Sequence, residues 1–154
     1  MSTARLARWI ATCGGAGDLR PAPGTWGTLV GTGLALATQA TAGPSATLVL
    51  AAALLVAGTW AAGTYARENG IADPSEVVVD EAGAIALVLA LVPFQIWSVA
   101  LSFALFRLFD IWKPWPVSLA ERRLKGAAGI MADDYVAGAL TIAGVWIVDT
   151  VLLP

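Results

Sequence analysis

The sequence predicts an all-α fold, a multihelical bundle embedded in a membrane, with apolar hairpins and one charged face. The chain is 58% hydrophobic and only 13% charged, whereas soluble domains are about 45–50% apolar and about 25% charged. All nine Lys and Arg residues, and ten of the eleven Asp and Glu residues, fall in three windows, 5–20, 67–81 and 107–134. No segment alternates apolar and polar residues over a useful length, so we expect no sheet.

Length, charge and residue usage exclude several classes of protein. The 154 residues suit one domain, which we expect to occupy 1–154. The net charge of -2 provides no basic surface for nucleic acid, so we expect no nucleic-acid partner. The chain has no histidine, which excludes a Ser-His triad, phosphohistidine chemistry and His-ligated zinc. Cys13 is the single cysteine, and we expect it to pack as a small apolar residue.

The first third of the chain is expected to form an amphipathic segment and an apolar helix. The amphipathic segment occupies residues 1–20. The run Pro21–Gly24 is incompatible with regular helix, and Thr25 then provides an N-cap for an apolar helix over 26–42. An uncharged turn at 42–45 follows.

A second apolar helix is expected over 46–66. At about 1.5 Å per residue, its length is enough to cross a hydrocarbon layer of about 30 Å. The next helix is expected to begin at Asp73, with Pro74 in the first helical position and Glu76 completing a capping box. This helix then continues into the apolar stretch 82–92.

The last third of the chain contains two more apolar stretches and a charged connection. Pro93 interrupts the preceding helix, and the run 94–106 is expected to continue as helix until Pro114. Residues 117–134 form the charged connection. A last apolar helix is expected over 135–153.

The positions of the uncharged turns predict that all three charged windows lie on one side. Each apolar hairpin turns at an uncharged break, one at 42–45 and one at 93–95. Each therefore returns to the side where it began, which the positive-inside tendency assigns to the cytoplasm. The stretch 82–92 would span only about 16 Å as helix, which favours a re-entrant pair broken at Pro93. The alternative is a single span over 82–106, which would place the second and third windows on opposite faces.

Acidic residues gather at the mouths of the apolar helices. Asp80 and Glu81 precede one apolar run, Asp110 lies in the third window, and Asp133 and Asp134 precede the last run. Carboxylate oxygens are ligands that Mg²⁺ prefers, so we expect these five residues to bind Mg²⁺ directly or through water. The plainer interpretation is that the two acidic pairs only cap helices or favour their N-terminal ends.

Basic residues near these carboxylates are candidates for phosphate binding. Arg107 and Lys113 are expected to hold a transferring phosphoryl group and to stabilise its charge. The turn at Gly24 and Thr25 presents backbone N–H groups at a helix start, which is another way to bind an anion.

Three further cations in the third window have two interpretations. Arg122, Arg123 and Lys125 either form a solvated or lipid-headgroup face, or Arg123 and Lys125 bind the substrate. Together with the carboxylates, they suggest a Mg²⁺-assisted reaction on a phosphate-bearing lipid in a membrane. Spacing alone does not separate hydrolysis from transfer.

Several segments of the chain resemble the phosphatidylglycerophosphatase A family. The most specific is Arg107–Pro114, with the sequence Arg-Leu-Phe-Asp-Ile-Trp-Lys-Pro. The chain departs from the family pattern at Ala72, where histidine is often found, and at Thr28, where serine is usual. The matching segments cover most of the chain in the family's order and are 15–28, 73–81, 106–114 and 122–134.

The resemblance implies a Mg²⁺-dependent helical enzyme of the bacterial inner membrane, with its active site on the cytoplasmic side. Its reaction would hydrolyse the terminal phosphomonoester of phosphatidylglycerophosphate and release phosphatidylglycerol and phosphate. Under this hypothesis Asp80, Asp110, Arg107 and Lys113 are catalytic, a metal-activated water is the nucleophile, and Glu81 is a second ligand or general base. A covalent aspartyl-phosphate at Asp80 or Asp110 is a variant of the same hypothesis.

Two other classes of function remain as alternatives. One is a Mg²⁺-dependent phosphatidyl-transferring membrane enzyme, whose Asp-Gly-x-x-Ala-Arg signature this chain lacks. The other is a non-catalytic membrane interaction protein whose carboxylates only cap helices. An assay of phosphate release with and without Mg²⁺ separates these alternatives from the phosphatase.

Overall fold

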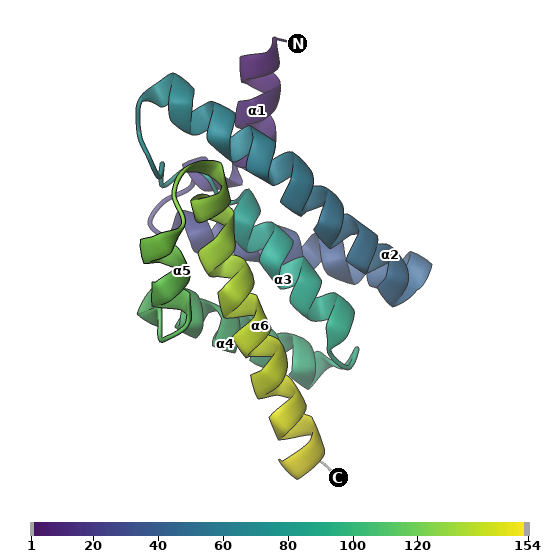
Figure 1. Ribbon diagram of the computed structural model, residues 1–154. Coiled ribbons are helices and arrows are strands. Elements are labelled where there is room, and N and C mark those ends of the chain that lie inside the picture. Colours follow the sequence, from purple (N-terminus) through teal and green to yellow (C-terminus); the bar gives the residue numbers. More distant parts are fainter. Residues whose placement is uncertain (1, 153–154) are drawn as a thin grey trace.

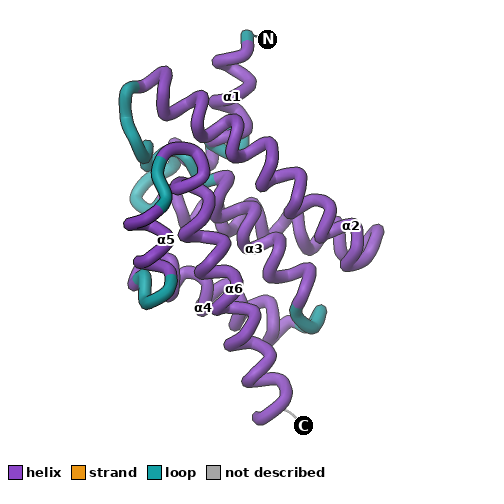
Figure 2. Tube along the Cα trace, in the orientation of Figure 1, coloured by secondary structure: helices purple, strands orange, loops and turns teal. Residues whose placement is uncertain are grey.

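The computed structural model describes residues 2–152, which form helices and connecting loops without a strand in that range (Figure 2). The predicted all-α class is therefore confirmed for this part of the chain. A short 3-10 turn, Ala16–Asp18, follows the first helix. The α-helices are α1 (Thr3–Ala11), α2 (Pro23–Asn69), α3 (Val79–Leu91), α4 (Ile96–Trp112), α5 (Val117–Arg123) and α6 (Gly126–Leu152).

Helix α2 is a hairpin of two long arms. Its helical geometry is broken at Gly43, where φ is 80° and ψ is -179°, a conformation that favours glycine. Figure 1 shows the two arms folding back on each other at this turn. The predicted turn is confirmed, but Thr25 lies inside the first arm, because Pro23 already occupies the first helical turn. The prediction that Thr25 is the N-cap was therefore wrong.

Helix α3 lies at the centre of the bundle, between α2 and α6 (Figure 1). Apart from Asp80 and Glu81, its residues from 79 to 90 are glycine or apolar, and nearly all of them are buried, as expected for a helix that is buried all round. Its first turn approaches α2 closely. A Cβ atom on Gly31 of α2 would lie 2.5 Å from the backbone of Ala82, and one on Gly27 would overlap Val78. Small residues on α2 therefore fix the position of α3.

The chain reverses between α3 and α4, so the alternative of one span over 82–106 was wrong. Helix α3 ends at Leu91, and α4 begins at Ile96 after a four-residue break. Helix α4 returns far enough for Arg107 Nη1 to lie 3.8 Å from Glu81 Oε1. The second and third charged windows therefore meet at one end of the molecule, as the turn positions predicted.

The prediction that a helix begins at Asp73 was wrong. Residues 73–78 are not helical, with a turn at Ser75 and Glu76, and α3 begins only at Val79. Tertiary contacts explain the difference, because the Val78 N–H donates to the Ala11 carbonyl and the Glu76 carboxylate pairs with Arg20 at 3.1 Å. These contacts hold the segment against the N-terminal part of the chain, so Glu76 does not complete a capping box.

The last helix begins earlier than predicted. Helix α6 starts at Gly126, so Asp133 and Asp134 lie about two turns inside it and do not precede it. The two glycines in this region do not break the helix. Gly129 is needed for packing, because a Cβ atom there would lie 2.7 Å from the Leu124 carbonyl oxygen. Position 153 of the predicted helix lies outside the described residues.

Much of the outer surface away from the charged end is apolar. Helices α2 and α6 are long and apolar enough to cross a membrane by length and composition. Large apolar side chains on these two helices are widely exposed, including Val56 at 73% and Ile147 at 62%. An exterior of this kind is typical of a protein in contact with lipid. Membrane embedding is therefore compatible with the fold.

Candidate active site

A cavity of about 300 Å³ opens at the charged end of the molecule. Glycine, proline and apolar residues form part of its wall, but charged side chains dominate it. Among the described residues, six carboxylates and two cations line it, so its formal charge is strongly negative. These charged residues are Asp73, Asp80, Glu81, Arg107, Asp110, Lys113, Asp133 and Asp134.

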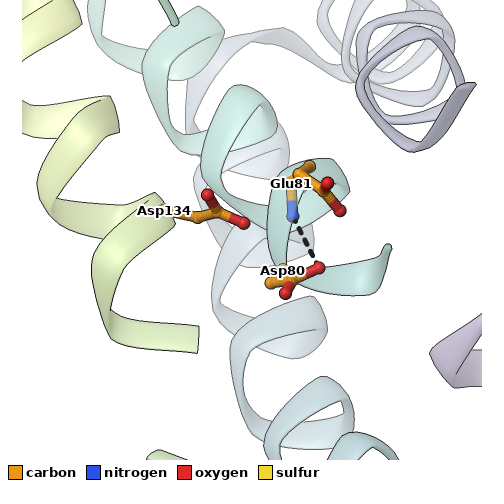
Figure 3. Close-up of side chains that lie close together, drawn as sticks. All are labelled: Asp80, Glu81 and Asp134. Atoms are coloured by element: carbon orange, nitrogen blue, oxygen red, sulfur yellow. Dashed lines mark hydrogen bonds between the residues drawn. The ribbon is translucent and has the colours of Figure 1, made fainter. Parts of the chain in front are cut away.

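Three carboxylates from two helices that line this cavity lie close together (Figure 3). Asp80 and Glu81 belong to the first turn of α3, where the helix dipole favours negative charge. Asp134 comes from α6 and is only 4% exposed, and Asp80 is 7% exposed. One oxygen from each residue lies within 4.8 Å of the others. Asp80 Oδ1 also accepts a hydrogen bond from the Glu81 backbone N–H at 3.0 Å.

Burial makes it costly to keep all of these carboxylates charged. Burial, reinforced by the charges of Glu81 and Asp134, raises the pKa of Asp80 well above its usual value. Burial also raises the pKa of Glu81 to about 7. Glu81 Oε2 is buried and has no hydrogen-bond partner among the described residues. An orphaned carboxylate oxygen among other carboxylates is a donor set that suits a hard divalent cation.

Arg107 links α4 to the carboxylates at the start of α3. Its Nη1 donates to Asp110 Oδ2 at 2.6 Å, and Glu81 Oε1 lies 3.8 Å away. Its Nε is buried and has no partner in the described part of the chain, so one strong donor stays free. Gly24 at the start of α2 leaves room for this arrangement. A Cβ atom there would overlap the Glu81 carboxylate and lie 3.0 Å from an Arg107 nitrogen.

Lys113 joins three helices at the rim of the cavity. It is the residue after α4 and has a left-handed backbone with φ of 49°. Its Nζ lies 2.7 Å from Asp133 Oδ2 on α6 and 2.8 Å from Glu121 Oε1 on α5. Burial lowers the pKa of Lys113, but these two carboxylates outweigh burial and raise it. Lys113 is therefore a firmly charged ammonium group.

Cys13 lies against Val78, the residue before α3, and packs as a small apolar residue, as expected. Its Sγ is 3.8 Å from the Val78 carbonyl oxygen, to which it donates. Burial, together with the negative charge of Glu81, raises the pKa of this thiol to about 12. At neutral pH it is a thiol rather than a thiolate, and only the thiolate is an effective nucleophile.

The structure brings most of the predicted site residues into the one cavity. The five carboxylates expected to bind Mg²⁺ all line it, as do Arg107, Lys113 and Gly24. The five carboxylates are not equivalent. Asp80, Glu81 and Asp134 form a tight group, whereas Asp110 and Asp133 are paired with cations.

Three predicted substrate-binding residues do not line this cavity. Thr25 adjoins it through Gly24 without forming its wall. Lys125 lines a smaller neighbouring cavity of about 170 Å³, and Arg123 is exposed at the end of α5.

Sequence reasoning also missed two residues. Asp73 lines both cavities and Glu121 lines the smaller one. Asp73 was predicted only as a helix cap, and the only sequence signal of Glu121 was its place in a charged window.

Known proteins resemble this chain over most of its length. A family model described as phosphatidylglycerophosphatase A matches residues 9–149. The phosphatidylglycerophosphatase A of Haemophilus influenzae is 34% identical over 136 residues, which cover 88% of this chain and 83% of the relative. The enzyme of the same name from Escherichia coli is 39% identical over 77 residues, covering 49% of this chain and 45% of the relative.

A third relative carries a different name. A protein of Bacteroides thetaiotaomicron with the provisional name phosphatidylinositol-3-phosphatase is 41% identical over 136 residues, and the match covers 84% of each chain. All three names describe phosphatases that act on phospholipids. No solved structure matches this chain.

Proposed function

The chain belongs to the phosphatidylglycerophosphatase A family, and on that basis we propose that it hydrolyses the terminal phosphomonoester of phosphatidylglycerophosphate with the help of Mg²⁺. The products are phosphatidylglycerol and inorganic phosphate. One observation carries the proposal within this chain. Carboxylates from α3, α4 and α6 meet two cations in one cavity at the charged end. We propose that the lipid phosphate enters this cavity from the membrane surface. The whole of 1–154 would act as one domain.

The metal is proposed to bind at the tight carboxylate group. Asp80, Glu81 and Asp134 would hold it, and the orphaned Glu81 Oε2 supports this assignment. When bound, Mg²⁺ would polarise the phosphoryl group and offset its negative charge. Asp110 lines the same cavity as this group, and its Oδ2 accepts a hydrogen bond from Arg107 Nη1 at 2.6 Å. It would hold Arg107 and complete the outer ring of ligands.

The cations of the cavity would bind and orient the phosphoryl group. Arg107 has an unused, buried Nε donor, and a guanidinium suits phosphate oxygens because its N–H groups form a planar fork. Lys113 provides a point charge at the rim. In the alternative in which Asp80 and Asp134 alone hold the metal, Glu81 would act as the general base that accepts a proton from an attacking water.

The apolar helices would hold the enzyme in the membrane that contains its substrate. The relatives named above come from bacteria, so we propose the bacterial cytoplasmic membrane. The cations lie in the windows of the charged end, which the positive-inside tendency places in the cytoplasm. The active site would then face the cytoplasmic leaflet.

One relative supports a second candidate substrate. The match to the Bacteroides thetaiotaomicron protein is about as extensive as the match to the Haemophilus influenzae enzyme, and its name refers to another lipid phosphomonoester. A 3-phosphorylated inositol lipid is therefore the competing substrate. Both candidates need the same carboxylates and cations, and they differ only in the alcohol that carries the phosphate.

Phosphate release from purified protein in detergent tests the proposal. Wild-type protein with Mg²⁺ is expected to release phosphate from phosphatidylglycerophosphate faster than from phosphatidylinositol 3-phosphate, and EDTA is expected to abolish release. Asp80→Asn and Asp110→Asn are each expected to lower kcat by about a hundredfold or more. Asp149→Asn is the matched control, since this residue lies about 22 Å along α6 from Asp134.

Two outcomes would contradict the proposal. If Asp80→Asn and Asp110→Asn both kept wild-type activity, the acidic cavity would not be the active site. Release from neither lipid, combined with CMP-dependent lipid exchange, would favour the transferase.

A further inference from the structure

Glu121 holds the cation that the proposed reaction needs for phosphate binding. Its Oε1 lies 2.8 Å from Lys113 Nζ, and Asp133 Oδ2 lies 2.7 Å from the same nitrogen. Lys113 lines the main cavity, Glu121 lines the smaller one, and Asp133 lines both. An ammonium group has three N–H donors, so these two carboxylates already use two of them.

The two carboxylates hold Lys113 with unequal strength. The Asp133 side chain is only 14% exposed and belongs to the long helix α6, whereas the Glu121 side chain is 50% exposed on the seven-residue helix α5. Ion pairs at exposed positions are weak, because water and salt screen them and side-chain entropy opposes them. The Glu121–Lys113 contact is therefore the one that an incoming anion can replace.

We propose that Glu121 is a displaceable counter-ion, which occupies on Lys113 the position that a phosphate oxygen of the substrate takes. This inference rests on the proposed function, and it assigns Glu121 a positioning role that acts through Lys113. In the substrate-free protein, Glu121 keeps Lys113 beside Asp133 and directed at the cavity rim. Phosphate binding releases Glu121 into solvent, so that Lys113 exchanges one carboxylate for the ligand.

The layout of the two cavities agrees with this exchange. They share Asp73, Ile130 and Asp133 as a wall, and the Lys113–Glu121 contact crosses the rim between them. Displacement of Glu121 would remove one negative charge from a region where Asp73 and Asp133 already repel an anion.

Binding of inorganic phosphate, in the presence of Mg²⁺, tests this proposal by calorimetry on the full chain in detergent. Glu121→Gln is expected to lower the Kd for phosphate by about two- to fivefold, the range that weak exposed ion pairs correspond to. The KM for the lipid substrate is expected to fall in the same direction. Glu68→Gln is the control, because it makes the same charge change at an exposed residue that lines neither cavity.

A double-mutant cycle tests whether the effect passes through Lys113. In a Lys113→Met background, Glu121→Gln is expected to change phosphate affinity no more than Glu68→Gln does. An unchanged or higher Kd for phosphate in Glu121→Gln would overturn the proposal, and so would an equal effect of Glu68→Gln. The proposed function fails separately, if wild-type protein binds phosphate but releases none from either lipid.

Discussion

At the scale of single residues, neighbours decide which carboxylates can serve a metal and which serve a cation. Asp110 and Asp133 are each within 2.7 Å of a basic nitrogen, on Arg107 and Lys113 respectively. Glu81 instead keeps one buried oxygen without a partner among the described residues. Carboxylates of the same cavity are therefore proposed to have two roles, whereas from the sequence we predicted that all five bind Mg²⁺.

The raised pKa of Glu81 predicts an unusual pH dependence of stability. Its pKa is about 7 in the folded protein and 4.5 in an unperturbed chain. Between these values the folded metal-free protein binds more protons than the unfolded chain, so the free energy of unfolding falls as pH rises through this window. We expect the Tm in EDTA to fall from about pH 5 to about pH 8. Excess Mg²⁺ should restore Tm at the upper end, because it binds the ionised carboxylates.

Differential scanning calorimetry in detergent, with EDTA or with Mg²⁺, checks this expectation. Glu76→Gln is a useful control, since the Glu76 side chain pairs with Arg20 and does not line the cavity, so the difference between the two conditions should persist. A Tm in EDTA that rises over this pH range would show that the buried carboxylates are not the dominant titrating groups.

At the scale of elements, close packing between α2 and α3 holds the acidic turn in place. Gly27 and Gly31 are one turn apart on the first arm of α2, and both leave room for the start of α3. Because Asp80 and Glu81 lie in that first turn, any shift of α3 moves two of the proposed metal ligands. Stability and activity should therefore depend on the same glycines.

Two glycines on one helix provide a matched test of this packing. Gly31→Ala would place a methyl group 2.5 Å from the Ala82 backbone, so we expect a loss of about 1–3 kcal/mol in stability or more, with lower activity. Gly33→Ala meets no atom within 4 Å, and alanine favours helix over glycine by up to about 1 kcal/mol. Thermal unfolding and phosphate release are to be compared for both. Equal behaviour of the two variants would refute the role assigned to the contact.

The elements also show where sequence reasoning was sufficient and where it failed. The turn at Gly43 and the end of α4 before Pro114 were predictable, because glycine and proline act locally on the backbone. The start of α3 was not, since a hydrogen bond from Val78 to Ala11 overrides the local capping signals at Asp73. Local rules do not contain such long-range contacts.

The candidate site shows the same division. The acidic and basic residue types were evident from their positions beside apolar runs, so the sequence was enough to identify Asp80, Glu81 and Asp134 as candidates. It was not enough to identify Glu121, which depends on how α5 is placed against Lys113. The placement of a seven-residue helix is set by tertiary packing, because so short a helix has little stability of its own.

At the scale of the whole molecule, one end is charged and the other is apolar. Ion pairs of the charged end connect segments that are far apart in the sequence, including Arg20 with Glu76 and Lys113 with Asp133. The turns at the other end, around Gly43 and Pro93, carry no charged residue. If the apolar helices lie in a bilayer, this polarity determines the orientation of the protein.

Labelling of single cysteines tests that orientation. In a Cys13→Ala background, cysteines at Glu68 and Arg122 are expected to react with a membrane-impermeant reagent from the same side, since both positions lie at the charged end. A cysteine at Ser45, beside the hairpin turn, is expected to react from the other side or to stay protected within the bilayer. Labelling of the first two positions from opposite sides would contradict the arrangement.

The proposed reaction requires one divalent ion that α3 and α6 hold together. Anomalous diffraction from crystals grown with Mn²⁺, which accepts the same oxygen ligands as Mg²⁺, measures this directly. The account predicts an anomalous peak about 2.0–2.3 Å from carboxylate oxygens of Asp80, Glu81 and Asp134, and no such peak in Asp80→Asn. Strong Mn²⁺ density elsewhere, with these three carboxylates free of metal, would contradict it.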